Sequence, residues 1–597
     1  MKKKITHVLL GIALTAFVLR LAIGIDLFVN DPFSGNPPAT TDMATYINSA
    51  LSIINLNYSE VFYYQPFYYA VFMPLTLLLF CGSIIGTVVT QAVLGAATVY
   101  LAGISCARIF GKKAAVITAL LLAFNNVLTA YTAYCLIEIL QAFWITLILY
   151  LSVEVIRKSS PKRWIIIGII TGLSILTRGN IWFFVPGLAA LALYCGCRNG
   201  RKSFLPLTLL IAFIIIPQLP FAAWNTVKLG KLSGPSTAGS AVLALGNTPE
   251  APPAGKDPGS FGPGPMEYPL SFHVWMADLE KKSVPSRIFK WFKEEPLAYT
   301  ELTFRKILLF WDWREVPNNI ELKYNCSKST IFSRLPLIPN YFAIFPGLAG
   351  FIAFLLYAIK RRNPKLLILL YFIAAYTMAT ALFYILGRFR LPCIPLMGIT
   401  AGGFFYFFFK AFVKKKRMMF YSFFVAFCFA GFISFASYDL YRGGLEKNII
   451  RLVRPDGIRI DVLPNRFVYL DNGPVTCGGW IPQELKSGDT LRKKFMIREK
   501  GPFIKSVMTI RLFWESEGFA ELETNGMPFT IKSGTAGLKE HEIPVVINND
   551  GFVRLTLNKI GSAKVFYITD LQRDYGRTFI NDEKSPGELV SFLEISK

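Results

Sequence analysis

The chain has 597 residues, of which 53% are hydrophobic, and 52 of them are phenylalanine. Its mean hydropathy of +0.44 excludes an ordinary soluble protein, because soluble domains seldom collect apolar residues into runs of ~20. The formal charge of +25 does not indicate nucleic-acid binding, since Lys and Arg stand in short loops rather than in one compact basic domain. Composition therefore predicts a polytopic α-helical membrane protein.

The apolar segments predict about eleven membrane-spanning helices. Arg20 interrupts the first apolar run and no small-x-small cleavage site follows, so we expect a retained first helix rather than a signal peptide. Residues 67–80 are too short for a crossing and are expected to form an interfacial or re-entrant piece. The expected spans are 8–26, 84–107, 114–131, 135–156, 164–177, 180–197, 204–222, 340–359, 366–386, 391–413 and 418–437.

Basic residues fix the expected orientation of these helices. With a cytoplasmic N-terminus, every second loop is rich in Lys and Arg and lacks Asp and Glu, as the positive-inside rule requires. One crossing more or fewer would move half of these clusters to the wrong side. The basic residues are Lys2–Lys4, Arg108, Lys112, Lys113, Arg157, Lys158, Lys162, Arg163, Arg198, Arg201, Lys202, Lys360, Arg361, Arg362, Lys365 and Lys414–Arg417.

Two large loops and the C-terminal part then lie outside. The transmembrane core comprises residues 1–440, with outer loops at 27–66 and 223–339. The second loop starts with an irregular Gly- and Pro-rich stretch and continues with helices expected along the membrane surface. From residue 450 to 597, alternating apolar and polar runs separated by Gly, Asn and Pro predict an extracytoplasmic all-β, sandwich-like domain.

Cysteine and histidine do not suggest a metal centre. The nine cysteines include no CxxC pair, and there are three histidines, which leaves few ligands for a zinc site. We expect neither a metal nor another cofactor. Cys326 and Cys477 both fall on the expected outer side and could form a disulfide, although we favour unpaired core cysteines.

Asp42 is the leading candidate for catalysis. It stands in a polar run of the first outer loop, where a carboxylate can take a proton from an acceptor hydroxyl as general base. The alternative is structural, since a residue of Thr40–Asp42 would make a good helix N-cap. The sequence leaves both interpretations open. Asp26, Asp31 and Glu60 are weaker candidates for the same role.

Four arginines lie near the outer ends of spans, where the positive-inside rule gives no reason for a cation. They are Arg20, Arg178, Arg388 and Arg390. Arg suits bidentate phosphate recognition, and four on one side favour a phosphate site over snorkelling to lipid headgroups. Glu138 lies in an apolar helix near the same side and is either functional or a structural partner of one of these arginines.

Aromatic residues of the C-terminal domain allow two interpretations. Trp480, Trp514 and Tyr567 could stack on sugar rings. We favour a buried core position for most of them, because aromatic side chains contribute large apolar areas to protein cores.

A set of motifs follows in a characteristic order. They are Arg20 late in the first helix, TDMATY around Asp42, QPFYYAVFMPL from Gln65, LIEIL around Glu138, LTRGN (176–180), PFAAWNTVKLGKL (220–232), GSAVLALGNTPE (239–250), KEEPLAYTELTFRKILLFW (293–311), REVPNN (314–319) and GRFRLPCIPLM (387–397). In this order they resemble the membrane-embedded GT-C glycosyltransferases that use a polyprenyl-phosphate sugar. The resemblance is to bacterial relatives of protein O-mannosyltransferase and of the lipid A aminoarabinose transferase, and it covers about residues 1–440.

The resemblance implies inverting transfer of a sugar from a polyprenyl-phosphate donor to a protein, glycan or lipid acceptor at the outer face of the bacterial inner membrane. It implies Asp42 as the base and arginines as ligands of the donor phosphate, without a metal. The matching motifs also give supporting positions to Glu138, Tyr46, Gln65 and Glu315. Membrane lipids, and no nucleic acid, complete the expected partners.

Two departures and two rivals accompany this expectation. The Asp-Glu pair of the protein mannosyltransferases is Asp42-Met43 here, and the Lys-Pro of the aminoarabinose transferases is Gln65-Pro66. Both put a protein-mannosylation or lipid A role in doubt. A transporter or lipid-glycan flippase would require facing acids and helix breaks at mid-membrane in two matching halves, and no repeat is visible. A glycan-binding anchor would leave the outward arginines unexplained.

Overall fold

The computed structural model describes most of the chain outside the C-terminal part. The described residues are 3–37, 41–197, 203–248, 251, 253–254, 283–440, 469–470, 483–485, 490–496, 504–514, 516–524, 527–535, 537–547, 552–561, 565–567, 576–580, 587–591 and 594–596. The chain forms two compact units. One comprises Met1–Gly246, Asp257–Ser260 and Thr300–Ile449, and the other comprises Asn247–Lys256, Phe261–Tyr299 and Ile450–Lys597. The predicted boundaries at 440 and 450 stay a prediction.

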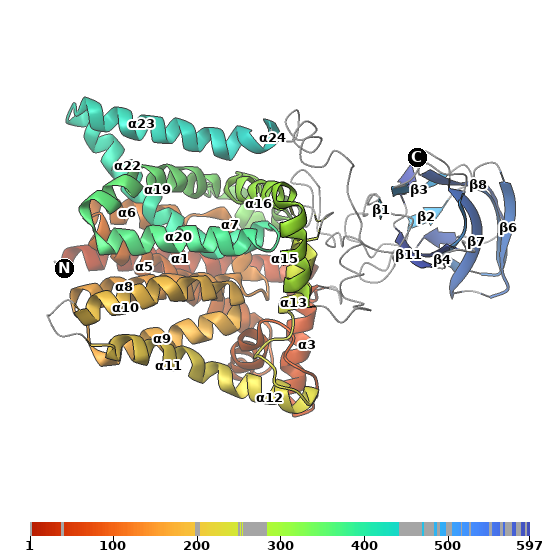
Figure 1. Cartoon of the computed structure of the whole chain (residues 1–597), viewed down its shortest axis with the longest axis horizontal. Helices are drawn as coiled ribbons and strands as arrows, with labels where there is room; N and C mark the ends of the chain where they lie inside the picture. The colour runs from red at the N-terminus through yellow and green to blue at the C-terminus, as the bar shows by residue number, and fades with distance from the viewer. Residues whose placement is uncertain are drawn as a thin grey trace. The chain divides into compact units, whose positions relative to one another are not determined.

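The first unit is a bundle of long apolar helices (Figure 1). Its helices of ten or more residues are α1 (Lys3–Asn30), α3 (Asp42–Ile54), α5 (Ile85–Ile109), α6 (Lys112–Ala123), α8 (Glu138–Arg157), α9 (Pro161–Thr177), α10 (Val185–Cys197), α11 (Leu205–Ile215), α12 (Leu219–Leu229), α16 (Pro296–Trp311), α19 (Tyr341–Arg361), α20 (Pro364–Ala381), α22 (Ile394–Val413) and α23 (Arg417–Phe432). The predicted polytopic helical membrane architecture is confirmed.

Nine helices in the described part are long and apolar enough to cross a membrane. The expected spans 114–131 and 164–177 are not among these nine, because α6 has only 12 residues and α9, although it covers all of 164–177, has 17. Asn125 ends the first of them by capping the separate short helix α7 (Asn126–Ala130), and Arg178 ends the second in extended backbone. The short apolar helix Tyr68–Leu79 matches the expected partial segment.

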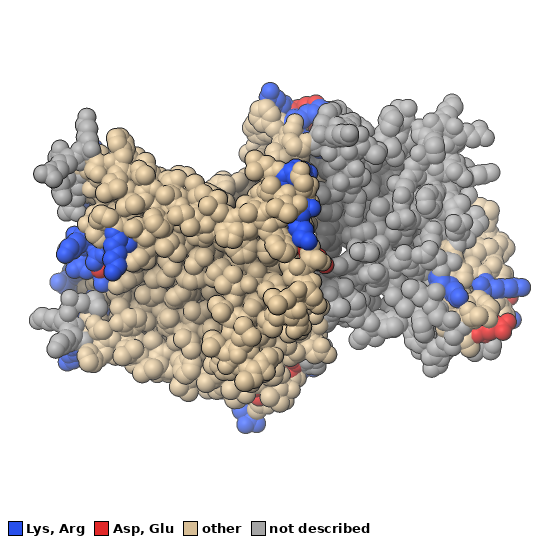
Figure 2. Space-filling model, turned by 90° about the horizontal axis from the view of Figure 1, so that it is seen from below, with Lys and Arg blue, Asp and Glu red and all other residues tan. Residues whose placement is uncertain are grey.

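Charged residues lie toward the ends of the helical unit. Figure 2 shows one face, where a broad band without charged side chains separates Lys and Arg at one end from charged residues near the other. A band of this kind suits the hydrocarbon core of a bilayer, where every charged side chain is costly.

Small residues let the helices approach closely. A Cβ at Gly350 of α19 would lie 2.5 Å from the carbonyl oxygen of Thr400 in α22, and one at Gly103 of α5 would lie 2.8 Å from Leu9 of α1. In a lipid environment, where apolar burial does not favour helix association, such close packing contributes dispersion energy that larger residues would forfeit.

The second unit contains two antiparallel six-stranded sheets, which agrees with the predicted β domain. One sheet has the order β1-β3-β8-β5-β6, with β12 pairing with β3, and the other has β11-β10-β4-β9-β2, with β7 pairing with β4. The strands are β1 (Tyr469–Leu470), β2 (Gln483–Leu485), β3 (Thr490–Met496), β4 (Ile504–Trp514), β5 (Gly518–Thr524), β6 (Met527–Ser533), β7 (Gly537–Ile547), β8 (Phe552–Ile560), β9 (Val565–Tyr567), β10 (Gly576–Ile580), β11 (Gly587–Ser591) and β12 (Glu594–Ser596). The unit also holds helix α15 (Val284–Glu294).

The close crossing of α19 and α22 gives a first prediction. Gly350→Ala should lower the free energy of unfolding by about 1–3 kcal/mol, because the new methyl group would meet backbone atoms rather than a movable side chain. The thermal unfolding midpoint in detergent should fall accordingly. Gly11→Ala in α1 is the matched control, since its Cβ would have no neighbour within 4 Å. Equal midpoints for the two variants would contradict the packing described here.

Candidate functional site

Asp42 is the first residue of α3, and the helix cap belongs to its neighbour. Thr41 adopts extended backbone, and its Oγ1 accepts the N–H of Ala44 at 3.3 Å. The N-cap requirement is therefore met one residue before Asp42. This leaves the Asp42 carboxylate available for contacts with other parts of the chain.

Three side chains hold the Asp42 carboxylate. Arg388 Nη2 donates to Oδ2 at 2.5 Å and Asn319 Nδ2 donates to the same oxygen at 3.1 Å, whereas the Tyr64 hydroxyl donates to Oδ1 at 3.2 Å. The side chain is 27% exposed. Burial by itself would raise the pKa of Asp42, but the Arg388 charge and the hydrogen bonds outweigh it and hold the pKa below the ordinary 3.8. Asp42 is therefore an ionised carboxylate at neutral pH.

Glu138 links Arg388 to a second arginine. Its Oε1 accepts from Arg178 Nη2 at 3.1 Å and lies 3.7 Å from Arg388 Nη1. The Glu138 side chain is fully buried, and its Oε2 has no hydrogen-bond partner within the described residues. Asp42, Arg388, Glu138 and Arg178 thus form one chain of ion pairs, which we call the site cluster. Its two positive and two negative charges balance.

The site cluster collects residues from four distant segments. Arg388 belongs to the short helix α21 (Gly387–Arg390), and Arg178 stands between α9 and the 3-10 helix η3 (Gly179–Phe184). Both guanidinium groups lie near the ring of Phe389, at 4.4 Å for Arg178 and 5.1 Å for Arg388 from its centroid. These cation–π contacts add to the ion pairs in fixing the two arginines side by side.

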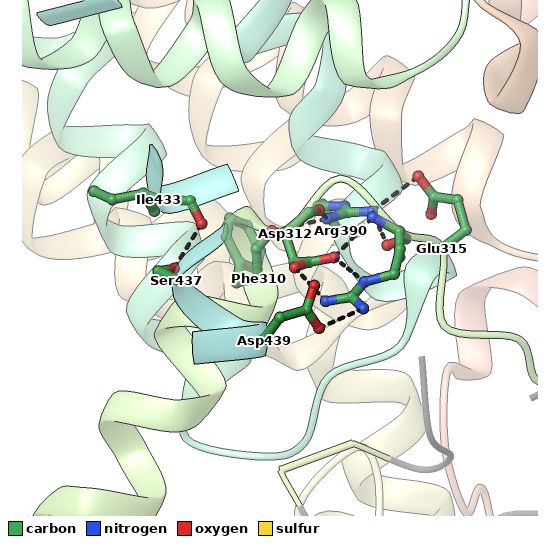
Figure 3. Close-up of polar contacts among 8 residues, drawn as sticks. Phe310, Asp312, Glu315, Arg390, Ile433, Ser437 and Asp439 are labelled. Carbon is green, nitrogen blue, oxygen red and sulfur yellow. Dashed lines mark hydrogen bonds and ion pairs between the residues drawn. The ribbon is translucent and has the colours of Figure 1, made fainter. Parts of the chain in front are cut away.

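Arg390, two residues away, is engaged with backbone instead. It donates to the carbonyls of Phe310, Asp312 and Arg314 and, at 2.8 Å, to the carboxylate of Glu315, as Figure 3 shows. The structure thus places Arg390 and Glu315 together, as the organisers of the turn after α16. This turn precedes Asn319, which contacts Asp42. The predicted phosphate role of Arg390 stays a prediction.

An ion pair also connects the same turn to the last described helix of the unit. Arg314 pairs with both carboxylate oxygens of Asp312, at 2.8 and 2.9 Å, and with Asp439 of α24 (Tyr438–Leu440) at 2.8 Å. The contacts are drawn in Figure 3. Asp439 is about half exposed, whereas Asp312 is buried. The turn therefore rests on a buried pair with a surface pair added to it.

Arg20 is buried at a different place. Its Nη2 donates to the carbonyl of Leu122 at 2.7 Å and its Nη1 to that of Ala123 at 3.1 Å, at the C-terminus of α6. These carbonyls lack helical partners, so the arginine satisfies them. In the part of the chain that the structure describes, Arg20 makes no contact with the site cluster. Its predicted phosphate role remains a prediction.

Tyr46 and Gln65 lie beside Tyr64, which contacts Asp42. The Tyr46 hydroxyl donates to Gln65 Oε1 at 2.5 Å, and its ring meets that of Tyr64 edge-on with centroids 6.0 Å apart. Gln65 has a φ of +46°, which a residue with a side chain seldom adopts. The hydrogen bond from buried Tyr46 helps to hold this turn, which carries Tyr64 beside Asp42.

The other acids of the first outer region have separate structural contacts. Asp31 is buried and accepts from Tyr134 at 2.7 Å and Asn325 at 2.9 Å. Asp26 accepts from the Ser329 hydroxyl at 2.5 Å and from the backbone N–H of Ile331 at 3.0 Å. Glu60 is exposed. Among the predicted bases, Asp42 is the one that the structure brings to the arginines.

Asn319 and Tyr64 are two residues that the sequence interpretation did not single out. Asn319 ends the motif REVPNN and Tyr64 directly precedes the motif that begins at Gln65, but Asn319 lies 277 positions from Asp42. Their role appears only when the fold brings the first outer loop and the turn after α16 together.

The remaining predictions concern metals, cysteines and the C-terminal domain. Within the described ranges, no three His, Cys, Asp or Glu side chains gather as a metal site would require, and independence of a metal stays a prediction. Trp514 is fully buried and donates to His541 at 2.9 Å, as expected for a core residue. Cys326 is a buried free thiol, whereas Cys477, Trp480 and the side chain of Tyr567 lie outside the described residues.

Comparisons with known proteins support the predicted resemblance. Residues 64–224 match the model of the dolichyl-phosphate-mannose-protein mannosyltransferase family. This segment contributes Tyr64, Gln65, Glu138 and Arg178. No curated protein matches the chain. The predicted resemblance to GT-C glycosyltransferases is confirmed by the family match.

Solved structures with low sequence identity are also similar. The archaeal oligosaccharyltransferase AglB from Archaeoglobus fulgidus, in complex with an inhibitory peptide and a dolichol-phosphate, shares 17% identity at a TM-score of 0.39, covering 68% of this chain and 51% of that one. ArnT from Cupriavidus metallidurans bound to undecaprenyl phosphate shares 14% identity at a TM-score of 0.37, covering 67% and 60%. The chain thus spans about half to three fifths of the length of these proteins.

The buried position of Glu138 gives a second prediction. Glu138→Gln leaves Arg178 and Arg388 without the charge between them, so we expect a loss of about 3 kcal/mol in unfolding free energy. A thermal unfolding series in detergent measures it. Asp439→Asn is the control, because it removes one ion of a half-exposed pair and should cost less than about 1 kcal/mol. A Glu138→Gln midpoint as high as that of the control would contradict the buried network.

Proposed function

We propose that this protein is a glycosyltransferase that moves a sugar from a polyprenyl-phosphate donor to an acceptor hydroxyl at the outer face of the bacterial inner membrane. The observation that carries the proposal is the contact between Asp42 and Arg388, with Arg178 joined to them through Glu138. A carboxylate paired with one arginine, with a second arginine linked to it through Glu138, would provide both a base and a phosphate site. The family match over residues 64–224 supports the same reaction class.

In the proposed reaction, an Asp42 oxygen takes the proton of the acceptor hydroxyl. The acceptor oxygen attacks the anomeric carbon from the face opposite the phosphate, and the bond between that carbon and the phosphate oxygen breaks. The phosphate leaves with the electron pair and gains one negative charge, so the sugar configuration inverts. The acceptor's negative charge never builds up, because its proton moves to Asp42 during the attack.

Arg388 and Arg178 would stabilise the leaving phosphate. Their guanidinium groups are buried and held in place, so they offer fixed positive charge where negative charge develops. Asn319 and Tyr64 would hold the Asp42 carboxylate in the orientation needed for proton transfer. The basic loops listed above support a cytoplasmic N-terminus and an outer C-terminal domain.

The test is transfer from a panel of radiolabelled polyprenyl-phosphate sugars by the purified full-length protein, with membrane extract as acceptor source. Asp42→Asn should lower the transfer rate by about 10²-fold or more, because Asn cannot accept the proton. Glu60→Gln, which alters an exposed acid of the same outer loop, should retain the rate.

Two results would contradict the proposal. Equal transfer by wild type and Asp42→Asn would remove Asp42 as base. No transfer from any donor, combined with movement of the labelled lipid across vesicles, would indicate a transporter of lipid-linked sugars.

The lowered pKa of Asp42 predicts the pH dependence. Burial opposes ionisation, but Arg388 outweighs it, so the carboxylate persists to a lower pH than an isolated aspartate would. In wild type, kcat/KM for the donor reports the free enzyme, in which Arg388 contacts Asp42. Its pH profile should therefore show no loss of activity from protonation of Asp42 above about pH 4. In Arg388→Gln, burial acts without the compensating charge, and the acid limb should move to higher pH whatever the absolute rate. A limb that stays in place would contradict the coupling of these residues.

A further inference from the structure

In this structure Arg388 already donates to the Asp42 carboxylate, and its Nε, which has no hydrogen-bond partner among the described residues, is buried. Its Nη2 binds Asp42 at 2.5 Å, its Nη1 lies 3.7 Å from Glu138, and its side chain is 7% exposed. An arriving phosphate group would therefore meet an arginine whose accessible contact is already made. The base and the phosphate of the proposed function need the same guanidinium group.

The charges of the site cluster lead to the same conflict. Asp42 and Glu138 already neutralise Arg178 and Arg388. A polyprenyl-phosphate sugar is a phosphodiester with one negative charge, so its binding beside an intact cluster adds an unbalanced anion in a partly buried place. Such an anion binds well only if one carboxylate gives up its arginine.

Burial decides which carboxylate can move. Glu138 is fully buried at the start of α8, and its contact with Arg178 would have to break in an apolar surrounding. Asp42 is 27% exposed at the first turn of α3, and Asn319 and Tyr64 still donate to it after Arg388 has left. The cost of releasing Arg388 is therefore lower for Asp42.

We propose that the donor phosphate displaces Asp42 from Arg388, so that donor binding frees the base and precedes acceptor binding. This inference rests on the proposed function and specifies the order of its steps. Before the donor binds, Arg388 occupies the Asp42 oxygen Oδ2 and competes with an acceptor hydroxyl for it. After the donor binds, the position on Oδ2 that Arg388 held is open to the acceptor, while Asn319 still donates to the same oxygen.

The exchange also agrees with the charges that change during transfer. When the acceptor proton arrives on Asp42, its carboxyl group becomes neutral and loses its attraction for Arg388. The leaving phosphate gains one negative charge in the same step. Arg388 therefore stays with the phosphate until that product departs, and then returns to Asp42 as it loses the proton to solvent.

The exchange is tested by the affinity of the full-length protein in detergent micelles for polyprenyl phosphate, which should rise when Asp42 is replaced. Asp42→Asn and Asp42→Ala remove the competitor for Arg388, so both should bind polyprenyl phosphate about tenfold more tightly than wild type. Glu60→Gln is the matched control for the loss of one negative charge in the same outer loop, and its affinity should equal that of wild type. The Ala variant keeps the test valid if the Asn variant does not fold.

The outcomes separate this inference from the proposed function. Wild type that binds polyprenyl phosphate, with Asp42 variants that bind equally or more weakly, would overturn the exchange and leave the glycosyltransferase proposal standing. Equal tightening in Glu60→Gln would show a general charge effect and would also overturn the exchange. Failure of every form, including wild type, to bind polyprenyl phosphate would overturn the proposed function together with the exchange.

Discussion

The Arg388 guanidinium is the constraint on which the candidate site depends. It bonds Asp42 of the first outer loop on one side and approaches Glu138 of α8 on the other. An arginine in an apolar surrounding is stable only with such partners, and each partner is likewise stabilised by the arginine. The ion pairs therefore join segments from distant parts of the chain. The same contact lowers the pKa of Asp42 and, in the proposed exchange, occupies its carboxylate until the donor phosphate binds.

A second arginine near this contact, Arg390, has a structural role. Arg390 lies two residues from Arg388 but turns to three backbone carbonyls and Glu315. By fixing the turn after α16, it indirectly determines where Asn319 meets Asp42. The sequence GRFR thus supplies one arginine for charge in the site and one for the backbone that borders it. A short helix makes this division possible, because residues two apart point to different sides.

The sequence predicted a polytopic helical membrane protein and the charged members of the site, but two of its eleven expected spans are helices of only 12 and 17 residues. Long apolar runs identify spans by length alone, and Asp42, Glu138, Arg178 and Arg388 stand out because charges near the ends of apolar helices need a reason. It could not separate Arg388 from Arg20 and Arg390, since all four outer arginines have the same chemistry and a similar place along their helices. Their partners are carbonyls or carboxylates more than 30 positions away in the chain, which only the fold brings near.

The neutral residues that contact Asp42 could not be predicted from the sequence for a related reason. Asn319 and Tyr64 are common polar residues in loops, and nothing about them marks a site until a carboxylate lies within hydrogen-bond distance. In the proposed exchange, however, they allow Asp42 two states. With Arg388 alone as a partner, a released Asp42 would lose all its hydrogen bonds and be drawn back to the cation. With Asn319 and Tyr64 still donating, the carboxylate can give up Arg388 and remain in place, which is the property that a base sharing its cation with a phosphate requires.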